Sequence, residues 1–166
     1  MSEKLYVSAF SAATILWNTH LGVSPYLQEA DGNSISAYTD HAIDDSFTFA
    51  DTAITDFATI TSIKLKGLTR CNIDTNTVEL LLTGSSGGAW SATTYFSGDG
   101  TNDFVPTESV DLKATINSLA RINECAMLAK KHNGGGAGTL ILKQVYLEIT
   151  VAAAIKENVM DGLVQA

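Results

Sequence analysis

The chain has 166 residues, a mass of 17.6 kDa and a formal net charge of −8. Hydrophobic residues make up 45% and charged residues 17%, a balance that excludes wholesale disorder and is enough for the core of one domain. With only 10 Lys and Arg residues, no nucleic-acid partner is expected, because phosphate binding needs clustered cations.

The first third of the chain predicts short strands separated by turns. Residues 5–10 alternate weakly between apolar and polar, and residues 35–38 and 46–50 are short segments of strand-forming composition. Asp31-Gly32 before them is a strong turn signal, because glycine adopts a positive φ at little cost.

The middle of the chain predicts a β-hairpin made of residues 59–71 and 75–83. The segment that joins them, CNIDTN, is rich in turn-forming residues. Apolar residues recur along both arms with a period close to two, which indicates one buried face in each: Ile60, Ile63, Leu65, Val78, Leu80 and Leu82.

The following segments predict two more strands with one short helix between them. Residues 90–97 and 125–130 have strand composition. Between them Asp111 is a suitable N-cap, followed by apolar residues at helical spacing: Leu112, Ile116, Leu119 and Ile122.

The clearest strand is residues 139–151, which follow the glycine-rich turn NGGGAG. One parity is apolar (Val145, Leu147, Ile149, Val151) and the other polar, so one face is expected to be buried, with Leu147 inside and Glu148 outside. All the apolar sets should meet in one core between two antiparallel sheets. We therefore predict an all-β protein, an antiparallel β-sandwich of the jelly-roll type with one short helix and a C-terminal tail.

The chain divides into a predicted sandwich domain, residues 1–151, and a tail, residues 152–166. The tail carries apolar residues at helical spacing with no core of their own, and these are the candidate protein-interaction residues: Ile155, Val159, Met160 and Leu163. The tail is expected to act as a contact arm between subunits; folding back on its own subunit is the alternative.

Catalytic signals are missing from the sequence, so no enzyme and no cofactor are expected. The three histidines, His20, His41 and His132, are scattered in turn-like contexts, and the sequence shows no strand-to-helix nucleophile elbow, since the segment GSSGGA is expected to be a flexible turn. Cys71 and Cys125 are expected to be two free thiols, and a disulfide between them is the alternative.

Two kinds of binding site are conceivable in the loops and strands. Loop carboxylates and amides could hold a structural calcium ion, although none matches a known loop spacing: Asp31, Asn33, Asp40, Asp44, Asp45, Asp99, Asn102 and Asp103. Aromatic side chains could form a platform for a sugar, the candidates being Trp17, Trp90 and Tyr95, with Phe96 beside them.

The order of segments resembles the jelly-roll modules shared by carbohydrate-binding domains and phage virion proteins. The resemblance covers residues 15–151 and rests on Trp17-Asn18 with Asp31-Gly32, Phe47-Thr48-Phe49, and the segments 60–67, 110–122 and 145–151. Calcium-binding sugar modules of this shape tend to place an aspartate before the closing strand, where this chain has Gln144. That departure counts against calcium and sugar binding.

With no signal peptide expected at the N-terminus and no apolar run long enough to span a membrane, the resemblance implies a virion component first. The predicted function is a non-enzymatic structural protein, a capsid decoration or minor capsid protein of a phage-like particle. It would be made in the host cytoplasm and located in the virion. Expected partners are the major capsid protein or another virion protein and copies of the chain itself, a trimer being favoured, with no membrane partner. The alternative is a glycan-binding or host-attachment module of a virion fibre.

Overall fold

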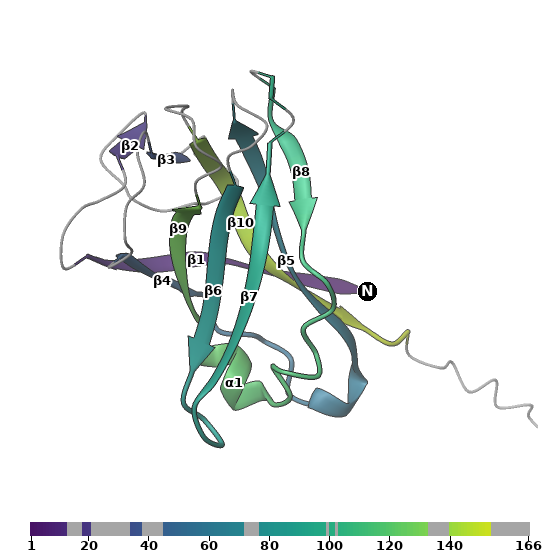
Figure 1. Cartoon of the computed structure of the whole chain (residues 1–166). Helices are drawn as coiled ribbons and strands as arrows, with labels where there is room; N and C mark the ends of the chain where they lie inside the picture. Colours follow the sequence, from purple (N-terminus) through teal and green to yellow (C-terminus); the bar gives the residue numbers. More distant parts are fainter. Residues whose placement is uncertain are drawn as a thin grey trace, which may run out of the picture.

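The computed structural model describes residues 1–12, 18–20, 34–37, 45–71, 77–98, 100–101, 103–132 and 140–153. Within them lie ten strands, a short 3-10 helix and one α-helix (Figure 1). The strands are β1 (Ser2–Ala12), β2 (Asn18–His20), β3 (Ser34–Ala37), β4 (Asp45–Phe49), β5 (Ile60–Cys71), β6 (Thr77–Gly84), β7 (Trp90–Ser97), β8 (Val105–Glu108), β9 (Ala126–His132) and β10 (Leu140–Val151). The helices are η1 (Phe57–Thr59) and α1 (Leu119–Asn123).

The strands form two antiparallel layers. In the first, which we call the β10 sheet, β10 pairs with β5 along one edge and with β1 and β3 along the other, while β8 pairs with β5 and β2 with β3. In the second, the β6 sheet, the order is β1, β4, β9, β6, β7. The fold class expected from the sequence, an all-β sandwich with one short helix, is confirmed.

Strand β1 belongs to both layers. Its first half, Ser2–Tyr6, pairs with β10, and its second half, Val7–Ala12, pairs with β4 after a register shift between Val7 and Ala9. In Figure 1 it crosses the molecule behind the upright strands of the β6 sheet. The two sheets are therefore joined by hydrogen bonds as well as by side-chain packing.

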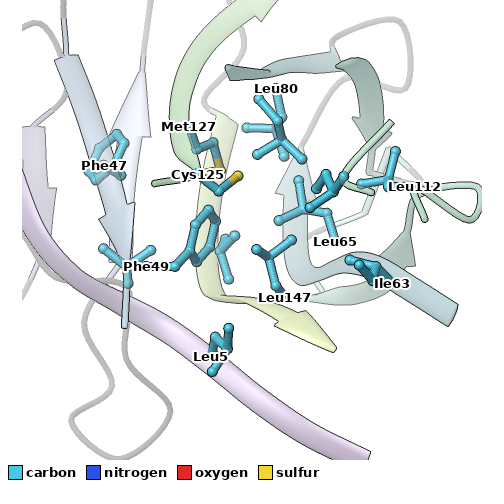
Figure 2. Packing of buried hydrophobic residues seen from close by; sticks show 14 of the residues in the cluster. Leu5, Phe47, Phe49, Ile63, Leu65, Leu80, Leu112, Cys125, Met127 and Leu147 are labelled. Carbon is cyan, nitrogen blue, oxygen red and sulfur yellow. The ribbon is translucent and has the colours of Figure 1, made fainter. Parts of the chain in front are cut away.

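One hydrophobic core fills the space between the sheets, as predicted. Each of the alternating sets contributes to it: Ile63 and Leu65 from β5, Val78, Leu80 and Leu82 from β6, and Val145, Leu147 and Ile149 from β10, with Val151 packed at the margin. Figure 2 shows Leu5, Phe49 and Leu147, from three different strands, converging on this core. Leu147 is fully buried, as expected.

The predicted hairpin between residues 59–71 and 75–83 is wrong. β5 pairs with β10 and β8, and β6 pairs with β9 and β7, so the two strands lie in opposite sheets. Their apolar faces pack toward each other across the core. Alternation shows that a strand has one buried face, but it does not show which strand lies beside it. The hairpin partner of β6 is β7, through the turn at 85–89.

Strands β9 and β10 do not pair with each other either, because they belong to different sheets, and the segment NGGGAG between them lies outside the described residues. The final strand itself is present, with one irregularity. Gln144 has a φ of 54°, and the pairing of β10 with β5 shifts register between Lys143 and Tyr146. Leu142 and Val145, three positions apart, therefore both belong to the core, because a bulge breaks the strict alternation of faces.

The helix is shorter than predicted and begins later. Ser118 is its N-cap and accepts a hydrogen bond from the Arg121 backbone N–H at 3.2 Å. Asp111 instead accepts from the backbone N–H groups of Ile63 and Lys113, each at 3.0 Å, so it ties the segment after β8 to β5. The predicted apolar residues remain inside: Leu112, Ile116 and Ile122 are buried, and Leu119 packs against the core.

Candidate functional site

The outward side of the β10 sheet gathers aromatic and charged side chains. We call this surface the tyrosine face and define it by the outward residues of four strands: Lys4 and Tyr6 of β1, Lys64, Lys66, Leu68 and Arg70 of β5, Pro106 and Glu108 of β8, and Tyr146, Glu148 and Thr150 of β10. In β1, β5 and β10 these positions alternate with buried ones, and Pro106 and Glu108 of β8 are paired directly with Leu68 and Lys66 of β5, so all these side chains lie outside the core.

Strand register arranges these side chains in two rows across the sheet. In the first row Glu108 is paired with Lys66, Lys66 with Tyr146, and Tyr146 with Tyr6. In the second row, two residues along each strand, Lys64 is paired with Glu148 and Glu148 with Lys4. Directly paired residues on one face of a sheet lie close enough to interact.

The two tyrosines form an aromatic pair at one end of the first row. The ring centroids of Tyr6 and Tyr146 are 5.2 Å apart, with a tilt of 48° between the ring planes. The ammonium of Lys4 lies 4.9 Å from the centroid of Tyr146, a cation–π distance. Both rings are half-buried, which holds them in place while leaving part of each open to solvent.

Ion pairs between lysine and glutamate side chains lie at the opposite end of the tyrosine face from the two tyrosines. Lys66 Nζ lies 2.6 Å from Glu148 Oε2 and 3.2 Å from Glu108 Oε2, and Lys64 Nζ lies 2.6 Å from Glu108 Oε1. The hydrogen bond to Glu148 raises the pKa of Lys66 above its ordinary value. The hydrogen bond from Lys64, with a second from Lys66, lowers the pKa of Glu108. These groups therefore stay charged at neutral pH.

A surface hollow of about 340 Å³ opens where the aromatic and the charged ends meet. Its walls are Lys66, Pro106, Thr107, Glu108 and Tyr146. A volume of this size lies in the range of small-ligand sites. The hollow offers a ring surface, an apolar proline edge, an ammonium donor and a carboxylate acceptor.

Trp90, a predicted platform residue, lies inside the protein instead. It is only 8% exposed, and its indole N–H donates to Glu124 Oε1 at 2.9 Å. Glu124 also accepts from the backbone N–H groups of Ser85 and Ser86 at 2.9 and 2.6 Å. Partial burial would raise the pKa of Glu124, but the hydrogen bonds from Trp90 and Ser86 lower it to about 2. Trp90 thus lacks the open ring face that a sugar platform needs.

Glycine at position 84 allows this cluster to close. A Cβ atom on Gly84 would lie 2.5 Å from both Glu124 Oε1 and Trp90 Nε1. Sequence reasoning could not connect these residues, because they come from the end of β6, the start of β7 and the residue after α1. The cluster anchors the β6–β7 turn rather than forming a ligand site.

The remaining aromatic and tail candidates also lie away from the tyrosine face or outside the described residues. Tyr95 is 56% exposed on β7 and points outward from the β6 sheet, on a different sheet from the tyrosine face. Trp17 lies outside the described residues, and so do the four tail candidates Ile155, Val159, Met160 and Leu163. Phe96 is buried and belongs to the core.

The candidate metal ligands and the two cysteines fall partly within the described residues. The described part of the chain holds no group of three His, Cys, Asp or Glu residues that could bind a metal ion. Most of the loop candidates for calcium, including Asp31, Asp40 and Asp99, lie outside it. Cys125 is a free, buried thiol whose burial raises its pKa to about 12, which leaves it unreactive at neutral pH. The side chain of Cys71 lies outside the described residues.

A second hollow lies where the last strand ends. It measures about 600 Å³ and is mainly apolar, with Met1, Thr59, Val151, Ala152 and Ala153 as its walls. The side chain of Met1 is 92% exposed beside it. None of the helices in the described ranges is long and apolar enough to cross a membrane.

No protein-family model matches the chain, and no curated protein does. Solved structures with similar folds include TmCBM61 in complex with β-1,4-galactotriose, which is 11% identical over 84% of this chain and 86% of that chain, with a TM-score of 0.46. A family 6 carbohydrate-binding module from Clostridium cellulolyticum in complex with xylose is 9% identical over 89% and 96%, also at 0.46. The xylan-binding module CBM15 is 12% identical over 92% and 97%, at 0.42.

These three structures to which the chain is similar are carbohydrate-binding modules, at identities of 9–12%. What the chain binds depends on its own surface residues.

Proposed function

We propose that the protein is a non-enzymatic glycan-binding module whose site is the tyrosine face. The observation that carries the proposal is the Tyr6–Tyr146 pair beside a hollow walled by Lys66 and Glu108. Sugar rings present apolar C–H faces and a rim of hydroxyl groups. Tyrosine rings suit the first, because they combine an apolar body with a polar tip, and charged hydrogen-bonding groups suit the second.

The ion pairs make the site rigid before any ligand arrives. Lys66 is held by two carboxylates, and Tyr146 contacts both Tyr6 and the ammonium of Lys4. Side chains that are already ordered lose less conformational entropy on binding, so more of the contact energy appears as affinity. Glycan binding is the alternative function expected from the sequence. The arrangement of the tyrosine face favours it over a purely structural role.

The same ion pairs argue against glycoside hydrolysis. That reaction needs one carboxylic acid that is protonated near neutral pH, with a raised pKa. On the tyrosine face the pKa of Glu108 is lowered, because Lys64 and Lys66 stabilise its ionised form. Glu108 therefore does not suit the role of general acid.

The proposal is tested by replacing Tyr146. On a glycan array, and in titration with any glycan that the array identifies, Tyr146→Ala should weaken binding by about tenfold or more, because it removes the ring that lines the hollow. The matched control is Tyr95→Ala, an exposed tyrosine on the other sheet, which should bind like the wild type. A binding loss in Tyr95→Ala with unchanged binding in Tyr146→Ala would move the site to the β6 sheet and contradict the proposal.

A second candidate function is a structural component of a virion, favoured by the apolar hollow at the end of β10. Ala152 and Ala153, the first residues of the tail, line the hollow, and the apolar residues farther along the tail are spaced as on one helix face. Burial of an apolar side chain stabilises by roughly 1.5–3 kcal/mol, so the hollow is a suitable binding site for an apolar segment such as the tail. In this function the tail of one subunit docks on another, in a homo-oligomer such as a trimer or on a major capsid protein.

Removal of the tail tests the second function. Deletion of residues 154–166 leaves the hollow intact and should convert an oligomer into a monomer, measured as mass by light scattering at several concentrations. The full-length variant Ile155→Asp, Val159→Asp should behave in the same way, because it removes apolar contacts without shortening the chain. An oligomer of unchanged mass in both variants would show that the tail is not the contact arm.

A further inference from the structure

The chain's positive charge is concentrated on the tyrosine face. Of the ten Lys and Arg residues, four point outward there: Lys4, Lys64, Lys66 and Arg70. Of the 18 Asp and Glu residues, the outward positions of the same four strands hold Glu108 and Glu148. The face therefore carries an excess of positive charge, although the whole chain has a net charge of −8.

The cations are placed where a ligand on the tyrosines would meet them. Lys4 Nζ lies 4.9 Å from the ring centroid of Tyr146, so the carboxylate of a sugar packed beside this ring would meet the ammonium. Lys66 forms a wall of the hollow on the other side of Tyr146. Farther along β5, the guanidinium of Arg70 lies 5.1 Å from the ring centroid of Phe104. The cations thus extend along the face on both sides of the hollow.

Glu108 and Glu148 offset two of the four positive charges of the face, and they also position the ammonium groups with which they pair. Glu108 holds Lys64 and Lys66, and Glu148 holds Lys66, so the ammonium groups are fixed in a row. An isolated lysine would lose side-chain entropy on meeting a ligand, whereas a lysine already held by a carboxylate has lost part of it. An ammonium has three donors, so it can accept a further anionic partner.

We propose that the glycan bound by the tyrosine face is acidic, a polymer containing uronic acid residues. This inference rests on the proposed function. A pyranose ring would stack on Tyr146, and its carboxylate would pair with the ammonium of Lys4 or Lys66. In a protein with a negative net charge, the positive face also attracts the polyanion to this one surface.

The experiment compares one polymer in charged and neutral forms. Polygalacturonate and its fully methyl-esterified form have the same backbone, and binding of each is measured by affinity electrophoresis and calorimetry at about 50 mM and about 500 mM NaCl. Polygalacturonate should bind about tenfold more tightly than the ester at low salt, and this preference should shrink at high salt. Lys4→Gln should lower the affinity for polygalacturonate more than the affinity for the ester, so the preference for the charged polymer should shrink.

The controls separate this inference from the function on which it rests. Lys130→Gln removes the same charge from β9 in the other sheet and should keep the preference for the acidic polymer. Equal binding of both polymers, insensitive to salt, would overturn the acidic ligand while leaving glycan binding in place. Binding of inorganic polyphosphate as tight as that of polygalacturonate, unaffected by Tyr146→Ala, would show simple ion exchange and overturn it as well. Failure to bind any glycan on the array would refute the proposed function itself.

Discussion

Leu147→Ala should lower the free energy of unfolding by about 2–5 kcal/mol, measured by urea denaturation. Leu147 is fully buried in the middle of β10, and in Figure 2 it lies between Leu5 and Leu65, which come from the two strands beside it. Truncation to alanine removes one methine and two methyl carbons and leaves a cavity that the surrounding strands cannot close, because both neighbours are hydrogen-bonded to β10.

The matched control is Leu81→Ala on β6. Leu81 alternates with the buried Leu80 and Leu82 and is half-buried on the outer side of the β6 sheet. Its truncation should cost at most about 1 kcal/mol, because solvent can fill the space. Equal losses in the two variants would contradict the assignment of the inner and outer faces.

Trp90→Ala should be at least as damaging, with a loss of about 3–5 kcal/mol. The indole packs in the core and also donates its N–H to Glu124, so the change creates a large cavity and removes one donor from a carboxylate that holds the β6–β7 turn. Trp90→Phe keeps most of the ring and loses the donor, so its stability should lie between the wild type and the alanine variant.

Tyr95→Ala provides the comparison on the same strand. Tyr95 is 56% exposed, and the alternation of β7 places it on the opposite side from Phe96 in the core. Thermal unfolding followed by circular dichroism should show a large drop in melting temperature for Trp90→Ala and a small one for Tyr95→Ala. A reversed order would mean that the inner side of β7 had been assigned wrongly.

The positions of most strands could be predicted from the sequence, whereas the strands with which they pair could not. Alternating apolar residues such as Val78, Leu80 and Leu82 identify a strand and its buried side, and the structure bears this out. Pairing depends on contacts between distant parts of the chain, which a local pattern does not encode. For this reason β5 and β6 looked like a hairpin although they face each other across the core.

The candidate site was missed for the same reason. Tyr6 and Tyr146 lie 140 positions apart, and only the register of β1 with β10 brings their rings together. Each alone is an ordinary tyrosine on the polar side of a strand. The aromatic residues that stood out in the sequence, such as Trp90, did so because they are large and apolar, which is also why Trp90 is buried.

Because β1 pairs with both sheets, the two layers should open together rather than one after the other. Residues Ser2–Tyr6 complete the β10 sheet and Val7–Ala12 complete the β6 sheet, within a single continuous strand. Release of β1 would expose an edge in each layer at once, so amide hydrogen exchange in β10 and in β4 should have the same opening free energy and the same dependence on denaturant. The tyrosine face loses Tyr6 and Lys4 in that same event, so the surface that we propose for ligand binding lasts only as long as the cooperative fold.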